Sequence, residues 1–397
     1  MADVLLVFNA GSTSLKFAAY AIDGRRELSL DVTGNVDAMQ AAPRFAVGDA
    51  AGNVLATHAW PAGHPVDRDE ALRFAVTWLR GHLADSSIVA AGHRMMLEGP
   101  RCDGPMRIDD ETLAELDALS ALEPSHQPFN VRGARTIAAL MPGLPQVACF
   151  DSSFHRTMPE VARTYALPRD MRDAGVLHQG YHGLSYEYIG DRMRALAPAA
   201  RRVIVAHLGG GCSLCAMLDG RSIETSMGLA GLSGLPMATR SGDIPPEALL
   251  YLLRSQRFDV ATLEKALYER SGLLGLSGIS GDMRLLQDSA EPQAIKAVRQ
   301  FVHAMTKYVG AYAAVLGGLD ALVFTAGIGE RSHQVRSALC AQLASLGVVL
   351  DERANLAGGA IVSAPDSRVS VRVIATNEEL MIARHTLALL DGAAAGR

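Results

Sequence analysis

Cysteine, lysine and long apolar runs are scarce in this 397-residue chain. The five cysteines are an odd number without the spacing of a disulfide framework, which predicts reduced thiols and a cytoplasmic location. Cys212 and Cys215 form a C-x-x-C, but no thioredoxin-like helix start surrounds them, so we interpret both as small apolar strand residues. The N-terminal stretch lacks the basic region and the long apolar core of a signal peptide. The longest apolar region, residues 308–329, is interrupted by Asp320 and glycines and predicts a helix, a turn and a strand rather than a membrane span.

Positive charge is also limited, since four lysines and 33 arginines face 42 acidic residues and leave a net charge of −5. This balance disfavours nucleic acid or an anionic membrane as a partner. Hydrophobic residues make up 49% of the chain and charged residues 20%, which is typical of a globular protein rather than a disordered one. The length exceeds the usual size of one domain, so we expect two.

Two segments nearly 200 residues apart resemble each other. Residues 4–25 and 203–221 each contain an apolar strand, a polar residue, a glycine-containing turn, Ser-Leu, a second apolar strand and Asp-Gly-Arg. Short apolar runs around such turns are typical of buried β-hairpins. The pattern therefore predicts a duplicated fold with a cleft between its halves, although two apolar hairpins can also resemble each other by chance.

Strands and helices alternate over the rest of the chain, which predicts an α/β architecture. Apolar residues at helical spacing predict helices at 68–84, 110–121, 130–141, 184–196, 246–254, 259–269, 290–316, 333–346 and 377–390. Short apolar runs predict further strands at 88–91, 146–150, 321–324 and 371–375.

Three turns rich in glycine or hydroxyl groups follow predicted strands, at residues 9–16, 207–211 and 325–330. Glycines expose backbone N–H groups that can bind phosphate oxygens, and Lys16 adds a positive charge to the first turn. None of these turns has P-loop spacing, and each alone is weak support for a site. Three in one chain are less easily explained by coincidence and favour a bound phosphate.

Several polar residues stand at the ends of the predicted elements, where functional sites of α/β proteins usually form. Arg94 and Asp151 follow strands, His182 precedes a helix, and Arg240 lies in a turn. Singly, each is more often structural, as an ion-paired arginine, a capping aspartate or a buried histidine.

The ordered set of motifs resembles the acetate kinase family, with its propionate and butyrate kinases, over nearly the whole chain. The segments that carry the resemblance are Asn9 to Phe17, His93 to Gly99, Phe150 to His155, Tyr181 to Ser185, His207 to Ser213, Met237 to Ile244, Ser277 to Arg284, Phe324 to Glu330 and Thr376 to Leu380. This resemblance implies a duplicated actin-like (ribonuclease H-like) two-domain fold with a nucleotide cleft between the domains. It also implies one domain of residues 1–150 plus 378–397, a second of residues 151–377, and a homodimer.

The resemblance further implies a role for each matching residue in an ATP-dependent carboxylate kinase. Asp151, His182 and Arg240 would be catalytic, Arg94 would bind substrate, and Asn9 and Glu378 would hold Mg²⁺, with Mn²⁺ as an alternative. The implied nucleotide-binding residues are Ser12, Ser14, Lys16, His207, Leu208, Gly209, Gly210, Gly211, Asp282, Met283, Arg284, Gly327, Ile328, Gly329, Glu330 and Arg331.

Departures from the family pattern gather where the family binds the acyl group, at Met96, Ser125, Tyr181 and Gly231. Methionine narrows such a pocket, whereas serine and glycine widen it or make it more polar. Since an apolar pocket separates substrates by only about 1–3 kcal/mol per methylene, acetate is the default acceptor and propionate, butyrate or a hydroxy acid stays an alternative. Gly210 replaces the family's asparagine, and Met283 replaces an aromatic residue.

The chemistry agrees with the implied roles. A short carboxylic acid has a pKa of about 4–5, by analogy with Asp and Glu, so the nucleophile is ionised at neutral pH and needs no general base. The difficulty is to bring one anion up to another, which calls for cations and in-line positioning. We therefore expect Asp151 to orient an arginine or a metal-bound water. A non-kinase actin-like nucleotide-binding protein, the alternative from another class, would not need Arg94 and Arg240.

Overall fold

The computed structural model describes residues 2–10, 14–37, 42–61, 63, 65–99, 102–124 and 126–395. The chain forms two compact units, the first made of Met1–Ser153 with Asn377–Arg397 and the second of Phe154–Thr376. Each is described by itself below. Within the described residues, no helix is both long enough and apolar enough to cross a membrane. The five cysteines all lie in the described residues, and none of them is in a disulfide.

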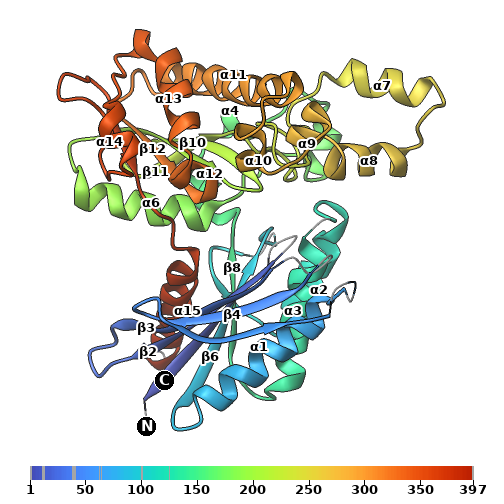
Figure 1. Cartoon of the computed structure of the whole chain (residues 1–397). Coiled ribbons are helices and arrows are strands. Elements are labelled where there is room, and N and C mark those ends of the chain that lie inside the picture. Colours follow the sequence, from blue (N-terminus) through green and yellow to red (C-terminus); the bar gives the residue numbers. More distant parts are fainter. Residues whose placement is uncertain are drawn as a thin grey trace. The chain divides into compact units, whose positions relative to one another are not determined.

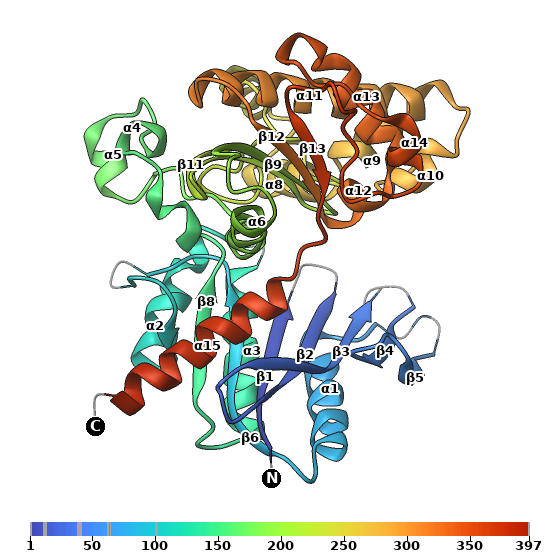
Figure 2. The ribbon, with the colours of Figure 1, turned by 90° about the vertical axis from the view of Figure 1, so that its left-hand side faces the viewer.

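The first unit is a mixed sheet with helices on both faces (Figures 1 and 2). Its sheet has the order β5-β4-β3-β2-β1-β6-β8-β7. The strands are β1 (Asp3–Ala10), β2 (Leu15–Ile22), β3 (Leu28–Asp37), β4 (Arg44–Asp49), β5 (Val54–Ala59), β6 (Ser87–Met95), β7 (Met106–Arg107) and β8 (Gln146–Phe150). The helices are α1 (Arg68–His82), α2 (Asp110–Ala118), α3 (Gln127–Leu140) and α15 (Glu378–Ala395).

Alternation along the strands sends successive side chains to opposite faces of this sheet. Leu6 of β1 packs in the core that contains Leu72 and Leu79 of α1. Leu5, the next residue along, packs with Leu387 of α15 on the other face. The C-terminal helix thus returns to cover the first sheet, as Figure 2 shows.

The second unit repeats this arrangement around a sheet of order β11-β10-β9-β12-β13. The strands are β9 (Arg202–Leu208), β10 (Cys212–Leu218), β11 (Arg221–Thr225), β12 (Ala321–Thr325) and β13 (Ser370–Val373). The helices are α4 (Glu160–Arg163), α5 (Arg169–Asp173), α6 (Gly183–Leu196), α7 (Pro246–Arg254), α8 (Val260–Glu269), α9 (Gly272–Ser277), α10 (Met283–Gln287), α11 (Pro292–Val315), α12 (Ala326–Arg331), α13 (His333–Gln342) and α14 (Glu352–Leu356). Helices α6 and α11 lie on opposite faces of the sheet (Figure 1).

The two sheets share one topology, which confirms the predicted duplication. In each, an antiparallel meander (β1–β2–β3 or β9–β10–β11) is extended on the side of its first strand by two parallel strands. The parallel strands are β6 and β8 in the first unit and β12 and β13 in the second. The predicted hairpins at residues 4–25 and 203–221 are the first two strands of each meander.

Some predicted elements differ in detail. Residues 325–330 were expected to form a glycine-rich turn, but residues 326–331 are helix α12, with Thr325 as its N-cap. The predicted helix 333–346 ends at Gln342, and a short 3₁₀ turn follows it. The predicted passage from helix to turn to strand within 308–329 is confirmed, because α11 ends at Val315 and β12 begins at Ala321.

Candidate active site

Arg94 and Asp151 meet at the ends of two parallel strands of the first unit. Arg94 lies near the end of β6, beside Cys149 of β8, and Asp151 directly follows β8. The Arg94 guanidinium donates from Nε, at 3.0 Å, and from Nη2 to the same oxygen, Oδ2 of Asp151. The aspartate side chain is fully buried and that of Arg94 is 11% exposed. The expected contact of Asp151 with an arginine is therefore present, and it fixes the direction in which the guanidinium points.

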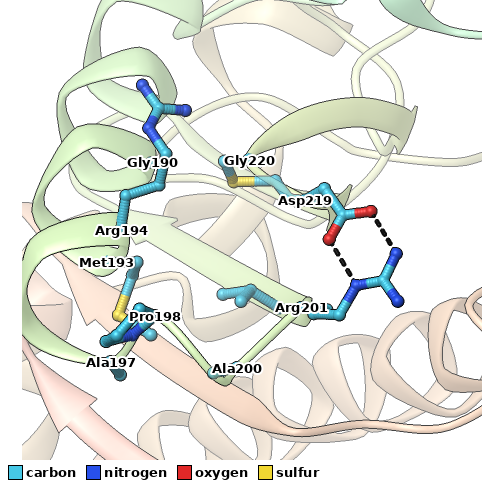
Figure 3. A pocket seen from close by; sticks show the side chains of 11 residues that line it. Gly190, Met193, Arg194, Ala197, Pro198, Ala200, Arg201, Asp219 and Gly220 are labelled. Atoms are coloured by element: carbon cyan, nitrogen blue, oxygen red, sulfur yellow. Dashed lines mark hydrogen bonds and ion pairs between the residues drawn. The ribbon is translucent and has the colours of Figure 1, made fainter.

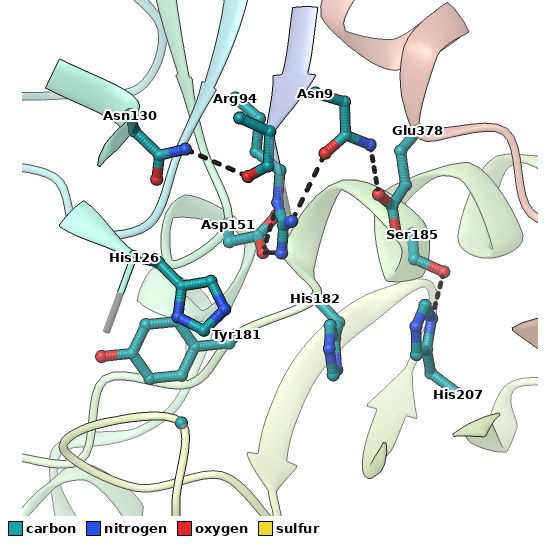
Figure 4. Close-up of polar contacts among 12 residues, drawn as sticks. Asn9, Arg94, His126, Asn130, Asp151, Tyr181, His182, Ser185, His207 and Glu378 are labelled. Atoms are coloured by element: carbon teal, nitrogen blue, oxygen red, sulfur yellow. Dashed lines mark hydrogen bonds and ion pairs between the residues drawn. The ribbon is translucent and has the colours of Figure 1, made fainter. Parts of the chain in front are cut away.

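Asn9 connects this ion pair to the start of α15. Its Oδ1 accepts from Nη1 of Arg94 at 3.3 Å, and its Nδ2 donates to Glu378 and to Glu379, each at 2.9 Å (Figure 4). Burial acts to lower the pKa of Arg94, but the charges of Asp151, Glu378 and Glu379 raise it above its usual value. This cluster is a buried, permanently cationic arginine that donates to the oxygen atoms of Asp151 and Asn9.

The second unit contains a pair of stacked imidazoles. His182 and His207 have ring centroids 4.1 Å apart and planes 16° from parallel. His182 is the N-cap of α6 and has a left-handed backbone (φ 59°), which a residue other than glycine rarely adopts. Buried His155 helps to hold this segment, because its Nε2 lies 2.9 Å from the Tyr181 carbonyl oxygen and its Nδ1 lies 2.8 Å from Ser222. Burial lowers the pKa of His155 to about 4, so this ring is neutral near pH 7.

Arg240 faces the same glycine loop as His182. A Cβ atom on Gly211 would lie 3.3 Å from Nε2 of His182 and 3.6 Å from Nη2 of Arg240. The guanidinium is held from behind by its Nη1, which donates to the Gly231 carbonyl at 2.6 Å. Both side chains thus present nitrogen atoms to the third glycine of the turn between β9 and β10.

A cavity of about 620 Å³ opens beside this loop within the second unit. Its lining includes eight of the predicted nucleotide-binding residues: Gly209, Gly210, Asp282, Met283, Arg284, Gly327, Ile328 and Arg331. These come from three separate segments of the sequence, so the fold assembles the predicted glycine-rich regions around one space. The volume is in the range of ordinary ligand sites.

The other predicted nucleotide-binding residues lie elsewhere. His207, Leu208, Gly211, Gly329 and Glu330 are not in the cavity lining. The Leu208 side chain is fully buried, and the Glu330 carboxylate accepts from the backbone N–H groups of Ala326 and Thr376. In the first unit, Ser14 precedes β2, and exposed Lys16 lies opposite Asn9 in the β1–β2 ladder, whereas Ser12 lies outside the described residues.

Two of the residues expected at the acyl pocket already make contacts that use their polar group or fill the space beside them. Tyr181 is fully buried, and its hydroxyl donates to the Leu229 carbonyl at 2.6 Å, so this group is already used. The space beside Gly231 is taken by the Arg240 guanidinium, so this glycine does not enlarge a pocket. Met96 is 3% exposed, and Ser125 lies outside the described residues.

His126 has no role assigned from the sequence. Its ring Nδ1 lies 3.3 Å from the fully buried Glu123 carboxylate, which also accepts from the His126 backbone N–H at 2.6 Å. Nearby, Asn130 donates to the Ala10 carbonyl at 3.2 Å. Figure 4 draws both side chains. Glu379, which directly follows the predicted metal ligand Glu378, also has no role assigned from the sequence.

The contact between Gly231 and Arg240 makes a testable prediction. In Gly231→Ala, the new Cβ would lie 2.7 Å from Nη1, so the guanidinium must shift. We expect a loss of about 10- to 100-fold in kcat, since misplacing a reacting group by about 1 Å has such effects. Steady-state kinetics and a melting curve would separate this from unfolding. Gly310→Ala is the matched control, because a Cβ there meets nothing within 4 Å; equal effects of both variants would contradict the prediction.

A second cavity, of about 350 Å³, lies between α6 and the Asp219–Gly220 turn (Figure 3). Its lining is mainly Met193, Ala197 and other apolar groups, and its Arg201 is paired with Asp219 through two hydrogen bonds of 2.6 Å. None of the predicted site residues lines it. The residues predicted to bind nucleotide therefore gather at the cavity beside the glycine loop and not at this one.

Comparisons with known proteins show the family of this chain. The chain matches the Acetokinase family over residues 4–384. An acetate kinase of Rhodopseudomonas palustris is 45% identical over 400 residues, covering 99% of this chain and all of the relative, and one of Nitrobacter hamburgensis is 46% identical over 98% and 96% of the two chains.

Solved structures give the same result. A propionate kinase from Francisella tularensis has a TM-score of 0.87 and 34% identity over 96% of this chain and 98% of its own. The acetate kinase of Porphyromonas gingivalis has a TM-score of 0.84 and 32% identity over 98% and 100%. The fold is thus the duplicated actin-like fold of these kinases. Because the matches span nearly the whole sequence, the chain belongs to the acetokinase family.

Proposed function

We propose that the protein transfers the γ-phosphoryl group of ATP reversibly to acetate, giving acetyl phosphate and ADP. The observation that carries this proposal is the family match over residues 4–384, with arginines present at both family positions, 94 and 240. An oxygen of the acid's carboxylate forms a bond to the γ-phosphorus, the bond from that phosphorus to the bridging oxygen breaks, and ADP leaves. Other short acids remain the alternative acceptors.

The first unit would bind the acid. Arg94 carries a permanent positive charge and is aimed by Asp151, so it can fix a carboxylate without moving a proton. The substrate is ionised at neutral pH, so Asp151 has no proton to remove. We assign Asp151 the role of orienting Arg94, and Arg94 that of binding an anionic oxygen of the acyl substrate.

The second unit would bind the nucleotide and the transferring phosphoryl group. The cavity beside Gly209 and Gly210 is lined by backbone-rich segments that suit a nucleotide. Arg240 and His182 point at the adjoining glycine, where their N–H groups can stabilise charge that develops on the phosphoryl oxygens. Phosphoryl transfer depends mainly on such positioning and charge stabilisation.

The donor set around Asn9 fits Mg²⁺. Two carboxylates, of Glu378 and Glu379, lie within hydrogen-bond distance of one amide group. Among the described residues, no cluster of three or more His, Cys, Asp or Glu could enclose a metal by itself. Proteins bind Mg²⁺ through one or two carboxylates together with waters and substrate phosphates, and Glu378 and Glu379 supply two carboxylates here. When bound, the ion would neutralise phosphate charge, and Asn9 and Glu378 would hold it.

A hydroxylamine trap tests the proposed function. Protein is mixed with ATP, Mg²⁺, hydroxylamine and acetate, propionate, butyrate or a hydroxy acid, and hydroxamate is measured. We expect hydroxamate with acetate, none without an acid, and none after chelation of the metal. ADP release that ignores the acid would instead indicate transfer to water, and the absence of any turnover would favour a non-kinase nucleotide-binding protein.

Two further predictions stay open. The resemblance implies a homodimer, which sedimentation of the purified protein would test. The cytoplasm remains the location predicted from the odd number of cysteines without the spacing of a disulfide framework.

A further inference from the structure

Arg336 is a buried arginine behind the wall of the cavity at the glycine loop. It belongs to α13, and only 1% of the residue is exposed. Its Nη1 donates to the carbonyls of Gly329 and Glu330, at 2.8 and 2.9 Å. Its Nε and Nη2 donate to the side-chain and backbone oxygens of Asn355, in α14, at 2.7 and 3.1 Å. All four acceptors are neutral oxygen atoms, three of backbone carbonyls and one of an amide.

No carboxylate balances this charge. Among the residues that the structure describes, no aspartate or glutamate forms an ion pair with Arg336, and the nearby Cys340 thiol is neutral near pH 7, because burial raises its pKa to about 12. Burial lowers the pKa of Arg336, but arginine keeps its proton in proteins. Burial also acts on Arg94, yet the charges of three carboxylates raise the pKa of that arginine. An unpaired ionic group is costly to bury, so an anion from outside the chain would stabilise Arg336.

The lining of the cavity holds as many acids as arginines. Apart from a histidine, its titratable side chains are two aspartates and two arginines, Asp282, Asp288, Arg284 and Arg331. Arg284 is also paired with Asp282, through hydrogen bonds of 3.1 and 2.6 Å. Arg240 faces the adjoining Gly211, outside this lining. A polyphosphate chain carries several negative charges, which the lining alone does not balance.

The carbonyls that Arg336 binds lie within one helical turn of that lining. They belong to α12, whose Gly327 and Arg331 line the cavity. A helix rises 1.5 Å per residue, so these carbonyls are only a few ångströms along the axis from Gly327. Ser332 and His333 also line the cavity, and they are the N-cap and the first residue of the helix that carries Arg336. The positive charge thus stands directly behind the part of the wall that α12 forms.

We propose that Arg336 is a positioning residue for the nucleotide, and that the phosphate groups of the bound nucleotide offset its unbalanced positive charge through the wall that α12 forms. This inference rests on the proposed binding of ATP and ADP. Direct contact is not required, because a unit charge acts over several ångströms where water screens it little. The same hydrogen bonds hold α12 in its helical form, so one side chain supports both the shape and the charge of the wall.

Asn355→Asp would cancel the charge while leaving the arginine in place. The new carboxylate takes the position of Oδ1, which accepts from Nε of Arg336, and forms a buried ion pair. The variant also loses the amide N–H groups that donate to His333 and Ser337, both at 3.0 Å, but this loss affects every ligand of the cavity alike. We expect the ratio of the Kd for ATP to the Kd for adenosine to rise about 10-fold, with ADP between them, because the lost attraction grows with the charge of the ligand. Isothermal titration calorimetry with the metal chelated measures the three constants.

Two variants at Arg336 test the same point if Asn355→Asp folds poorly. Arg336→Gln removes the charge and should change the ratio in the same direction, whereas Arg336→Lys keeps the charge and should change it least. Melting curves check that each variant is folded. Gln342→Glu is the matched control, because it adds one negative charge at an exposed position, the last residue of α13, and should leave the ratio unchanged.

The dependence on ligand charge separates an electrostatic role from a purely structural one. Equal losses for ATP, ADP and adenosine would overturn the inference, because a displaced wall weakens the binding of every ligand that touches it. Unchanged constants in both Asn355→Asp and Arg336→Gln would overturn it as well. In steady-state kinetics, the KM for ATP should rise while the KM for acetate stays constant, since the first unit would bind the acid. Failure of the proposed transfer would appear separately, as a wild type that binds ATP but makes no hydroxamate from any acid.

Discussion

Arg240→Ala should lower kcat by about 10³-fold, the lower end of what one arginine contributes to phosphoryl transfer. The guanidinium is held by the Gly231 carbonyl through Nη1 and points its Nη2 at Gly211. Alanine removes both the charge and the donor that we propose for the transition state. Single-turnover measurement of ADP formation, with saturating ATP and acetate, would report the chemical step itself.

Arg240→Lys and an added guanidinium salt sharpen this test. Lysine keeps the charge but cannot place one donor on Gly231 and a second, planar one on the phosphoryl group, so it should restore little activity. Guanidinium ion should partly restore Arg240→Ala. Arg201→Ala is the control, because this exposed arginine pairs with Asp219 away from the glycine loop. An Arg240→Ala enzyme that keeps more than a tenth of its kcat would contradict the assigned role.

Local pattern was enough to predict much of the fold. The predicted helix at 68–84 is α1, Arg68–His82, because its apolar stripe faces the sheet and Asp67 caps its first turn. The two hairpins were predictable because both strands of each are short apolar runs bounded by turn residues.

The outer strands of the first sheet could not be predicted in this way. β5 is mostly exposed and lies at the edge of the sheet, so its sequence shows no apolar face. Its position depends on pairing with β4, which is a tertiary contact. The alternation of apolar and polar residues therefore cannot predict this strand.

Helix α12 also could not be predicted from its local sequence. Two glycines within six residues favour a turn by intrinsic propensity. The helix is stabilised from outside, since the buried Arg336 side chain donates to the carbonyls of Gly329 and Glu330 at 2.8 and 2.9 Å. Glu330 also accepts from the backbone N–H of Ala326. An arginine in the next helix thus decides the conformation of a predicted phosphate loop.

The motifs identified the residues with unusual chemistry but not those that support them. Arg94, Asp151 and His182 stand out because charged or titratable groups at element ends are uncommon. Ser213 and Tyr186 are ordinary core residues by composition, and the contacts of the Ser213 hydroxyl with the His182 ring and the Tyr186 hydroxyl form only when β10 and α6 are folded against each other. The spacing of residues in the sequence does not predict that contact.

Asp151→Asn should lower kcat by about 10²-fold, the cost of losing one well-placed charged partner at a catalytic site. Asp151 accepts two N–H groups of Arg94 on one oxygen, and a neutral amide would hold the guanidinium weakly. The acid is already ionised, so the variant loses orientation rather than a base. The profile of log kcat against pH should therefore fall as a whole and gain no new ionisation.

A double-mutant cycle separates orientation from proton abstraction. If Asp151 acts by holding Arg94, adding Asp151→Asn to Arg94→Ala should cost little more, because the group that it orients is already gone. If Asp151 were a general base, the second substitution would cost its full factor, and activity would recover as hydroxide replaced the base at high pH. Melting curves must accompany the kinetics, since Asp151→Asn leaves the buried guanidinium with one acidic neighbour fewer, beside Glu378 and Glu379. Additive losses with recovery above pH 9 would assign the proton to Asp151 and exclude the orienting role.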